Sequence, residues 1–317
     1  MTSAAPAQPG SNGPVTSERA ALLGESRSMV GIITDPGAPG GKIGCVILNA
    51  GSIHRVGPQR IYVKIARRLA QLGITCVRFD YSGIGDSPTR RDSLPFAEFA
   101  VQEARAAMDA MQETLGIEKF VALGLCWGAD NALRVCHEDP RVVGGAIIDF
   151  YFVPSLRYWV RLYGRRMFSP RSWGNLLSGK SPVLRVGAGA LLQSVRQLLP
   201  ARAASASPDE VPAKPPREIL AEVGAAVARG VDLRFVFTCG SGSWDHYQTR
   251  FRKGLDALAP SGRVAVDYLP DSDHIFTQLH SQARLLEIVA EWGVGVLERD
   301  GDGAAASVPP VDAAADG

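Results

Sequence analysis

The sequence of 317 residues lacks several features, and each absence excludes a class of protein. No apolar run approaches the roughly 20 residues that a transmembrane helix needs. Residues 1–17 are rich in Ala, Pro, Gly and Ser and lack the apolar segment of a secretory signal. The formal net charge is only +2, which gives no bulk attraction to nucleic acid. We therefore expect a cytoplasmic protein without a transmembrane segment or a nucleic-acid partner.

Cysteine and histidine are scarce, with five residues of each. Most of the cysteines lie in or beside apolar strand or helix patterns, and an odd number of them predicts reduced thiols without a disulfide framework. Their spacing relative to the histidines does not match a zinc site. A dinucleotide loop is also excluded, because Pro88 stands where the third glycine should follow Gly83 and Gly85. We expect neither a metal nor another cofactor.

What the sequence does contain is a regular alternation of strand and helix patterns, with 46% hydrophobic residues to form a large core. The predicted strands cover residues 28–34, 42–48, 74–79, 120–123, 142–149, 231–237 and 264–269. The predicted helices include residues 61–72, 94–115, 217–229, 247–258 and 281–297. This alternation predicts an α/β fold with a mostly parallel sheet covered on both faces. The ligands of such sheets bind at the carboxyl ends of the strands.

The alternation is interrupted between residues 150 and 230, and this interruption sets the predicted domain organisation. The predicted parts are a core (28–149 and 231–298), an inserted cap (150–230, with a flexible stretch at 200–216) and two disordered tails (1–27 and 299–317). Residues 150–208 contain no Asp or Glu but many arginines with interleaved aromatic residues. Such a segment is typical either of a solvated basic face or of an anion-binding lid. In the second case the candidate anion-binding residues are Arg157, Arg161, Arg165 and Arg166.

The sequence Gly124-Leu-Cys126-Trp-Gly128 lies between a predicted strand and a predicted helix. Glycines on both sides of a sharp turn allow a strained nucleophile to approach neighbouring backbone closely. The helix that starts behind Cys126 favours a thiolate through its N-terminal dipole. A buried structural cysteine is the alternative, because free cysteines are often simply buried.

A cysteine nucleophile needs a base and, in most cases, a carboxylate that orients the base. Among the five histidines, only His274 lies in the short loop between the last predicted strand and the last helix. Asp245 follows the preceding strand and is the first candidate for the acid, and Asp149 is the second. Asp273 is more suited to shaping the turn beside His274. Cysteine also tolerates a weak or absent third member, because a thiol is more acidic than a hydroxyl.

The backbone N–H of Trp127 and an N–H within Gly51–Ile53, at Gly51 or Ser52, are the candidate donors of an oxyanion hole. The alternative for Asn49-Ala-Gly-Ser52 is an ordinary turn from strand to helix.

Three segments together resemble a known family: Asn49-Ala-Gly-Ser-Ile-His-Arg-Val-Gly-Pro-Gln-Arg60, Arg78-Phe-Asp-Tyr-Ser-Gly-Ile-Gly-Asp-Ser-Pro88 and Gly124-Leu-Cys-Trp-Gly128. From about Met29 to Leu297 the chain resembles the α/β-hydrolase superfamily, and within it the bacterial exosortase-associated and serine-aminopeptidase-like hydrolases. The resemblance implies Ser or Cys at position 126, a histidine at 274 and an acid after the strand ending at Phe237. It also implies that an insertion after the sixth strand forms a cap over the active site. Where many relatives have the acid, this sequence has Gly240-Ser-Gly-Ser243, with Asp245 two residues later.

These residues predict a cysteine-dependent acyl hydrolase that acts on an ester or thioester through a thioester acyl-enzyme. Transfer of the acyl group to an alcohol or amine, including cyclisation, is the second hypothesis, because a thioester retains group-transfer potential. A degenerate hydrolase that serves as a binding partner is the third. The basic lid would suit an acyl group carried by coenzyme A, phosphopantetheine or an acidic carrier protein, or anionic lipid headgroups.

Overall fold

The computed structural model describes residues 16–36, 41–92, 94–150, 214–239 and 242–300. Their centre is one sheet of eight strands in the order β1-β2-β4-β3-β5-β6-β7-β8. The strands are β1 (Ser17–Leu23), β2 (Met29–Asp35), β3 (Ile43–Leu48), β4 (Thr75–Phe79), β5 (Lys119–Leu125), β6 (Val142–Ile148), β7 (Asp232–Thr238) and β8 (Val264–Leu269). β2 pairs in antiparallel fashion with both β1 and β4, whereas every pairing from β4 to β8 is parallel. The predicted mostly parallel sheet is confirmed.

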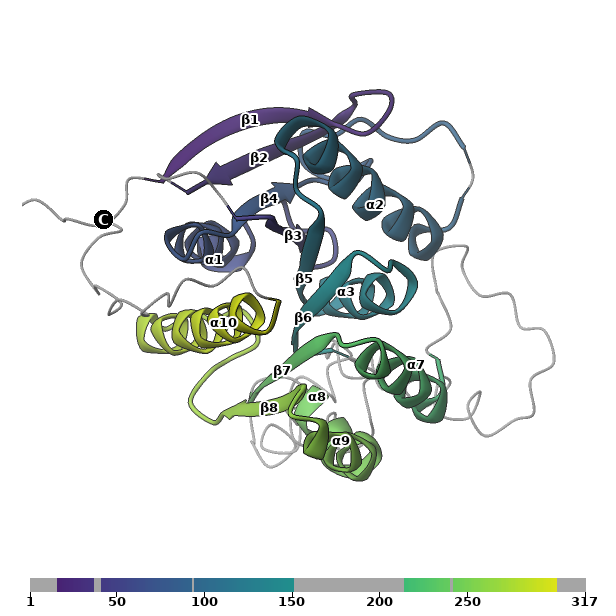
Figure 1. Cartoon of the computed structure of the whole chain (residues 1–317), viewed down its shortest axis with the longest axis vertical. Coiled ribbons are helices and arrows are strands. Elements are labelled where there is room, and N and C mark those ends of the chain that lie inside the picture. The colour runs from purple at the N-terminus through teal and green to yellow at the C-terminus, as the bar shows by residue number, and fades with distance from the viewer. Residues whose placement is uncertain (1–15, 37–40, 93, 151–213, 240–241, 301–317) are drawn as a thin grey trace, which may run out of the picture.

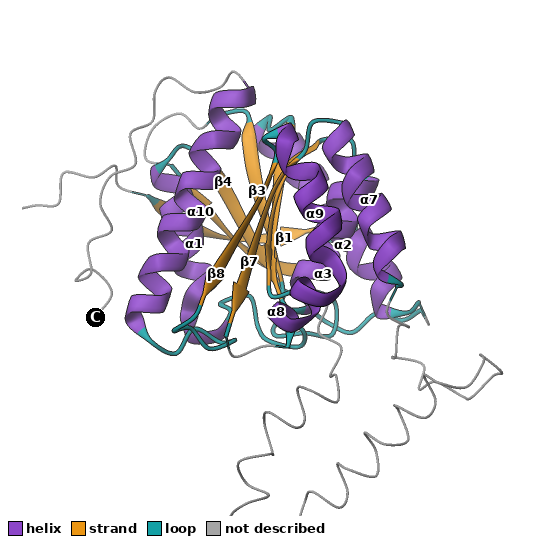
Figure 2. Cartoon of the chain, turned by 90° about the horizontal axis from the view of Figure 1, so that it is seen from below, coloured by secondary structure: helices purple, strands orange, loops and turns teal. Residues whose placement is uncertain are grey.

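Helices cover both faces of the sheet (Figure 1; Figure 2). α1 (Ile61–Gln71) and α10 (Leu279–Asp300) lie on one face, and α2 (Phe96–Leu115), α3 (Trp127–Glu138), α7 (Pro216–Ala228) and α9 (Arg252–Leu258) lie on the other. The short elements are η1 (Pro58–Arg60), α8 (Ser243–His246), the π-helical turn η2 (Tyr247–Phe251) and η3 (Ala259–Ser261). The helices thereby bury the sheet from both sides.

The alternation of side chains along the central strand β3 divides the core into two layers. Cys45 and Ile47 pack in the cluster formed with α1 and α10, whereas Val46 and Leu48 pack in the cluster formed with α2 and α3. All six residues of β3 are buried. A strand with both faces covered has a continuous apolar sequence, and such a run therefore predicts a central strand of the sheet.

Two predicted boundaries are wrong, because the core extends beyond them. Strand β1 lies within residues 1–27, which were assigned to a tail, and it pairs along its whole length with β2. Helix α7 was assigned to the cap, but its Ile219 and Val223 are buried in the core cluster of α2 and α3. α7 therefore belongs to the helical layer of the sheet.

No helix within the described part of the chain combines the length and the hydrophobicity that a membrane crossing requires.

Candidate active site

Cys126 stands at a sharp turn between β5 and α3, and the two flanking glycines are needed for close packing. A Cβ atom on Gly124 would lie 2.1 Å from the carbonyl carbon of Gly128. A Cβ atom on Gly128 would lie 2.5 Å from the carbonyl oxygen of Leu48, at the end of β3. The turn is therefore pressed against the end of the neighbouring strand, and only glycine fits at either position.

The backbone of Cys126 is in an unusual conformation, with φ 58° and ψ −123°. A non-glycine residue with positive φ is strained and persists only where its surroundings hold it. Here the N–H of Cys126 donates to the carbonyl of Ile148 at 2.9 Å, and the carbonyl of Cys126 accepts from Ala129 N at 2.8 Å. The hydroxyl of buried Tyr62 accepts a further hydrogen bond from Leu125 N at 2.9 Å. These bonds hold a half-buried thiol at the carboxyl edge of the sheet.

His274, in the loop between β8 and α10, joins this thiol to a buried carboxylate. Its Nδ1 lies 2.8 Å from Asp149 Oδ2, and its ring also interacts with the Cys126 thiol. Because Nδ1 faces Asp149, Nε2 is the nitrogen that remains for the thiol. Three segments distant in sequence thus bring a thiol, an imidazole and a carboxylate together.

Asp149 follows β6 directly and is fully buried. Its Oδ1 accepts from Thr238 N at 2.8 Å, and its Oδ2 accepts from Thr238 Oγ1 at 2.6 Å. Its backbone has φ 49°, and its N–H donates to the carbonyl of Val236 at 2.8 Å. A buried carboxylate is costly unless it is paired and hydrogen-bonded, and Thr238 and His274 together satisfy this one. The carboxylate is therefore fixed in position before a substrate arrives.

The charge of His274 depends on its two neighbours. Burial acts to lower the pKa of the imidazole, but the hydrogen bonds to Asp149 and Cys126 outweigh burial and raise the pKa to about 10, from an ordinary value of 6.5. The rise reflects the attraction of an imidazolium to a carboxylate on one side and a thiolate on the other. The contacts of His274 with Asp149 and Cys126 therefore favour a proton on the imidazole.

The carboxylate on His274 is thus Asp149, the second candidate from the sequence, and not the first, Asp245. Asp245 lies in the short helix α8, where its carbonyl accepts a hydrogen bond from Thr249 Oγ1 at 2.7 Å. Asp273 behaves as its position suggested, since its Oδ1 accepts from Thr277 N at 2.8 Å and caps the turn after β8. The signal for Asp149 in the sequence was its place at the end of an apolar strand beside Cys126, but that signal did not rank it above Asp245.

The loop after β3 reaches the same edge of the sheet. Gly51 has φ +60° and open space on the side where a side chain would stand, and Ser52 beside it is exposed. Trp127 is the first residue of α3, and the first N–H groups of a helix have no intrahelical acceptor. The packing of Gly128 against Leu48 and Asn49 brings this loop next to the Cys126 turn. The predicted oxyanion donors therefore come from segments that contact each other.

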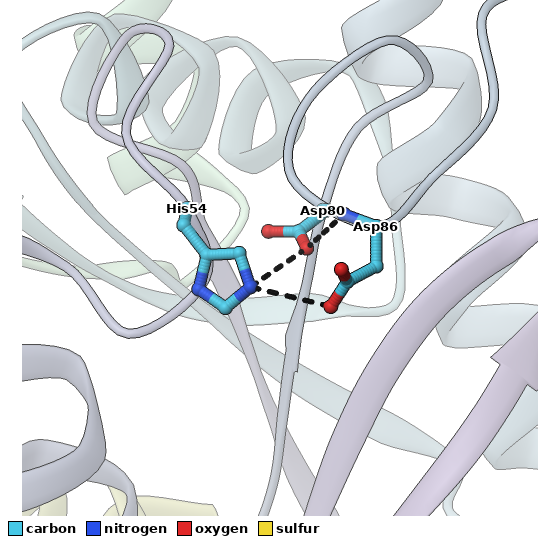
Figure 3. A group of neighbouring side chains, drawn as sticks. All are labelled: His54, Asp80 and Asp86. Atoms are coloured by element: carbon cyan, nitrogen blue, oxygen red, sulfur yellow. Dashed lines mark hydrogen bonds and ion pairs between the residues drawn. The ribbon is translucent and has the colours of Figure 1, made fainter.

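Among the described residues, one group has the donors for a metal ion: His54, Asp80 and Asp86, whose ligand atoms lie within 4.8 Å of one another (Figure 3). The Arg55 guanidinium already supplies a cation there. Its Nη1 contacts Asp80 Oδ2, and it lies 2.8 Å from Asp86 Oδ2 and 2.7 Å from His54 Nε2. The group therefore does not fit a metal ion while Arg55 occupies its centre.

The candidate anion-binding residues Arg157, Arg161, Arg165 and Arg166 lie outside the described residues, as does most of the predicted cap.

Comparisons with known proteins agree with the topology. Residues 48–149 match the family model of the alpha/beta hydrolase fold. An esterase from Pyrococcus furiosus superposes with a TM-score of 0.56 at 14% identity, over 90% of this chain and 91% of that chain. An alpha-beta serine hydrolase homologue from Coxiella burnetii superposes with a TM-score of 0.50 at 13% identity, over 87% of this chain and 96% of that chain. No protein with a curated description matches the sequence. The family match over residues 48–149 and the sheet topology confirm the predicted α/β-hydrolase fold.

Proposed function

We propose that the protein is a cysteine-dependent acyl hydrolase, with Cys126 as nucleophile, His274 as acid and base, and Asp149 as the carboxylate that orients His274. The observation that carries this proposal is that His274 contacts the buried carboxylate of Asp149 and also interacts with Cys126, which stands at a strained turn on the carboxyl edge of the sheet. Nucleophile, base and orienting carboxylate are the three roles of a hydrolytic triad, and their geometry identifies them better than sequence position does.

In the first half of the reaction, Cys126 Sγ attacks the carbonyl carbon of an ester or thioester, and the carbonyl electron pair moves to its oxygen. N–H groups of Trp127 and of Gly51 or Ser52 stabilise the oxyanion. When the electron pair returns, the bond to the leaving alcohol or thiol breaks, and the imidazolium of His274 donates its Nε2 proton to that group. The products are a free alcohol or thiol and a thioester on Cys126.

In the second half, water attacks the thioester carbonyl while neutral His274 accepts one of its protons at Nε2. Collapse of the second oxyanion breaks the carbon–sulfur bond. The carboxylic acid leaves, and Cys126 returns as a thiolate beside the imidazolium. An alcohol or amine could take the place of water, because the thioester retains more group-transfer potential than a serine ester. Turnover of an acyl thioester with and without added acceptors separates hydrolysis from acyl transfer by the identity of the product.

Apolar side chains beside the site support an acyl substrate. Ile53, Trp127 and Ile275 each follow or adjoin a residue of the proposed machinery, and they remain 39%, 51% and 42% exposed. The Trp127 ring also contacts the Phe96 ring, at 6.1 Å between centroids. Large apolar side chains that stay exposed around a reactive group are typical of a binding surface. Here they favour a substrate with an apolar acyl group.

The direct test compares two cysteines that are both half-buried, Cys126 and Cys239. Cys126→Ala should abolish turnover of a p-nitrophenyl ester while circular dichroism shows an intact fold, because the nucleophile is lost. Cys239→Ala is the matched control and should retain the wild-type rate. Turnover at the wild-type rate by Cys126→Ala would refute the proposed function.

A further inference from the structure

The structure points to a positioning role for Asp80, a buried carboxylate that the catalytic steps above do not use. We infer that Asp80 holds the loop between β3 and α1 in the conformation that presents its N–H groups to the oxyanion, and this inference rests on the proposed function. β3 and β4 are parallel neighbours in the sheet, so the loop after β3 and the loop after β4 leave from the same edge. Asp80 stands directly after β4, where it can reach the loop after β3.

The two oxygens of Asp80 bind the loop at several points. Oδ1 accepts from Arg55 N at 2.6 Å and from Asn49 Nδ2 at 3.4 Å. Oδ2 contacts the Arg55 guanidinium and His54 Nε2, the latter at 3.4 Å, and accepts from Asp86 N at 3.2 Å. Asp80 itself is fully buried. Such a carboxylate requires its partners, and the partners are in turn held by it.

The contacts of Asp80 lie on both sides, in sequence, of the proposed oxyanion donors. Asn49 precedes Gly51 and Ser52, and Arg55 follows them. Asn49 closes the loop further, because its Nδ2 donates to the carbonyl of Ile53 at 2.8 Å. The proposed oxyanion donors therefore lie in a short segment that Asp80 and Asn49 fix at each end.

The loop between β4 and α2 packs tightly against Asp80 at Gly85. A Cβ atom on Gly85 would lie 2.3 Å from Asp80 Oδ2 and 2.6 Å from His54 Cδ2. Figure 3 shows His54 approaching from the β3–α1 loop while Asp80 and Asp86 approach from the β4–α2 loop. The network joins the two loops, and the contacts described above that form it are made by residues other than Cys126 and His274. It should thus affect the oxyanion donors without affecting the thiolate.

Asp80→Asn tests this separation, because it keeps the shape of the side chain but places an amide against the Arg55 guanidinium. We expect kcat for ester hydrolysis to fall by about 10-fold or more, toward the roughly 100-fold cost of a lost oxyanion donor. KM should change little, and alkylation of Cys126 by iodoacetamide should stay within about 2-fold of the wild-type rate, because alkylation needs the thiolate and no oxyanion hole.

Asp232→Asn is the matched control. Asp232 is also a buried carboxylate held by arginines, Arg263 and Arg299, but it lies at the other end of the parallel strands. It should lower stability without lowering kcat. An Asp80→Asn kcat no lower than that of the control, or an alkylation rate that falls together with kcat, would overturn the positioning role.

A second variant covers the case in which Asp80→Asn does not fold. Arg55→Ala removes the side-chain nitrogen that contacts both Asp80 and Asp86, and it keeps the backbone N–H that donates to Asp80 Oδ1. A kcat reduced by about 10-fold at unchanged alkylation supports the inference, and a wild-type kcat contradicts it. Failure of the proposed function is recognised separately, because it would appear as turnover in Cys126→Ala.

Discussion

At the scale of single residues, Asp149 is the finding that the sequence did not favour. A carboxylate two residues late in the loop after β7 was an acceptable candidate on spacing alone. In the structure, the carboxylate that contacts His274 instead comes from the end of β6, next to the strand that carries Cys126. Thr238, at the end of β7, contributes an N–H and a hydroxyl to this acid in place of a carboxylate of its own. The carboxylate that contacts His274 thus follows β6, and the residue that hydrogen-bonds this carboxylate ends the neighbouring strand β7.

Asp149→Asn should lower kcat by about 10-fold or more, because an amide stabilises the imidazolium poorly and can hold the ring in the wrong tautomer. Steady-state hydrolysis of a p-nitrophenyl ester measures the effect. Asp245→Asn is the natural control and should keep kcat within about 2-fold of wild type. The reverse order of effects would restore Asp245 as the orienting acid.

At the scale of elements, the turn between β5 and α3 shows which structural features a short sequence motif can predict. Gly124 and Gly128 were recognised from sequence as positions of close packing, and the structure identifies the backbone atoms that each one meets. By contrast, β1 could not be recognised. Its burial pattern is almost entirely exposed, with only Leu23 buried, so hydrophobic periodicity does not distinguish it from a polar tail. The antiparallel pairing of β1 with β2 forms this strand, and the sequence of β1 alone does not indicate that pairing.

Gly124→Ala should destabilise the fold by about 3 kcal/mol or more, because the new methyl group meets the backbone of Gly128 and neither segment can move freely. Urea denaturation followed by circular dichroism measures the change. Gly224→Ala on α7 is the control, since nothing lies within 4 Å of its added Cβ. It should be neutral or stabilising by up to about 1 kcal/mol. Equal effects of the two substitutions would contradict the packing described for the turn.

At the scale of the whole molecule, the sequence predicted the sheet well because its central strands are covered on both faces. β3 and β5 read as continuous apolar runs, and each is followed by a helix of typical length. The apolar runs therefore also indicate where the loops after β3 and β5 lie, including the turn that holds Cys126. Contacts between loops, such as those of Asp149 with His274 or Asp80 with Arg55, depend on neighbours in space and carry no periodic signal in the chain.

Helix α7 illustrates the same limit for domain boundaries. Its sequence has helical spacing, but that spacing cannot say which surface the helix covers. The structure packs α7 against α3 and α9, so α7 belongs to the same helical layer as the helix that follows Cys126. α7 is thus part of the core and not of the predicted insertion.

The central claim is that the acyl group passes through a thioester on Cys126, and trapping that intermediate tests it most directly. The enzyme would be mixed with a slowly hydrolysed p-nitrophenyl ester, quenched in acid and analysed by intact mass and peptide mapping. We predict a mass increase of one acyl group, located on the peptide that contains Cys126, released by hydroxylamine and absent from Cys126→Ala. Turnover with no adduct on Cys126, or with the acyl group on another residue, would contradict the account.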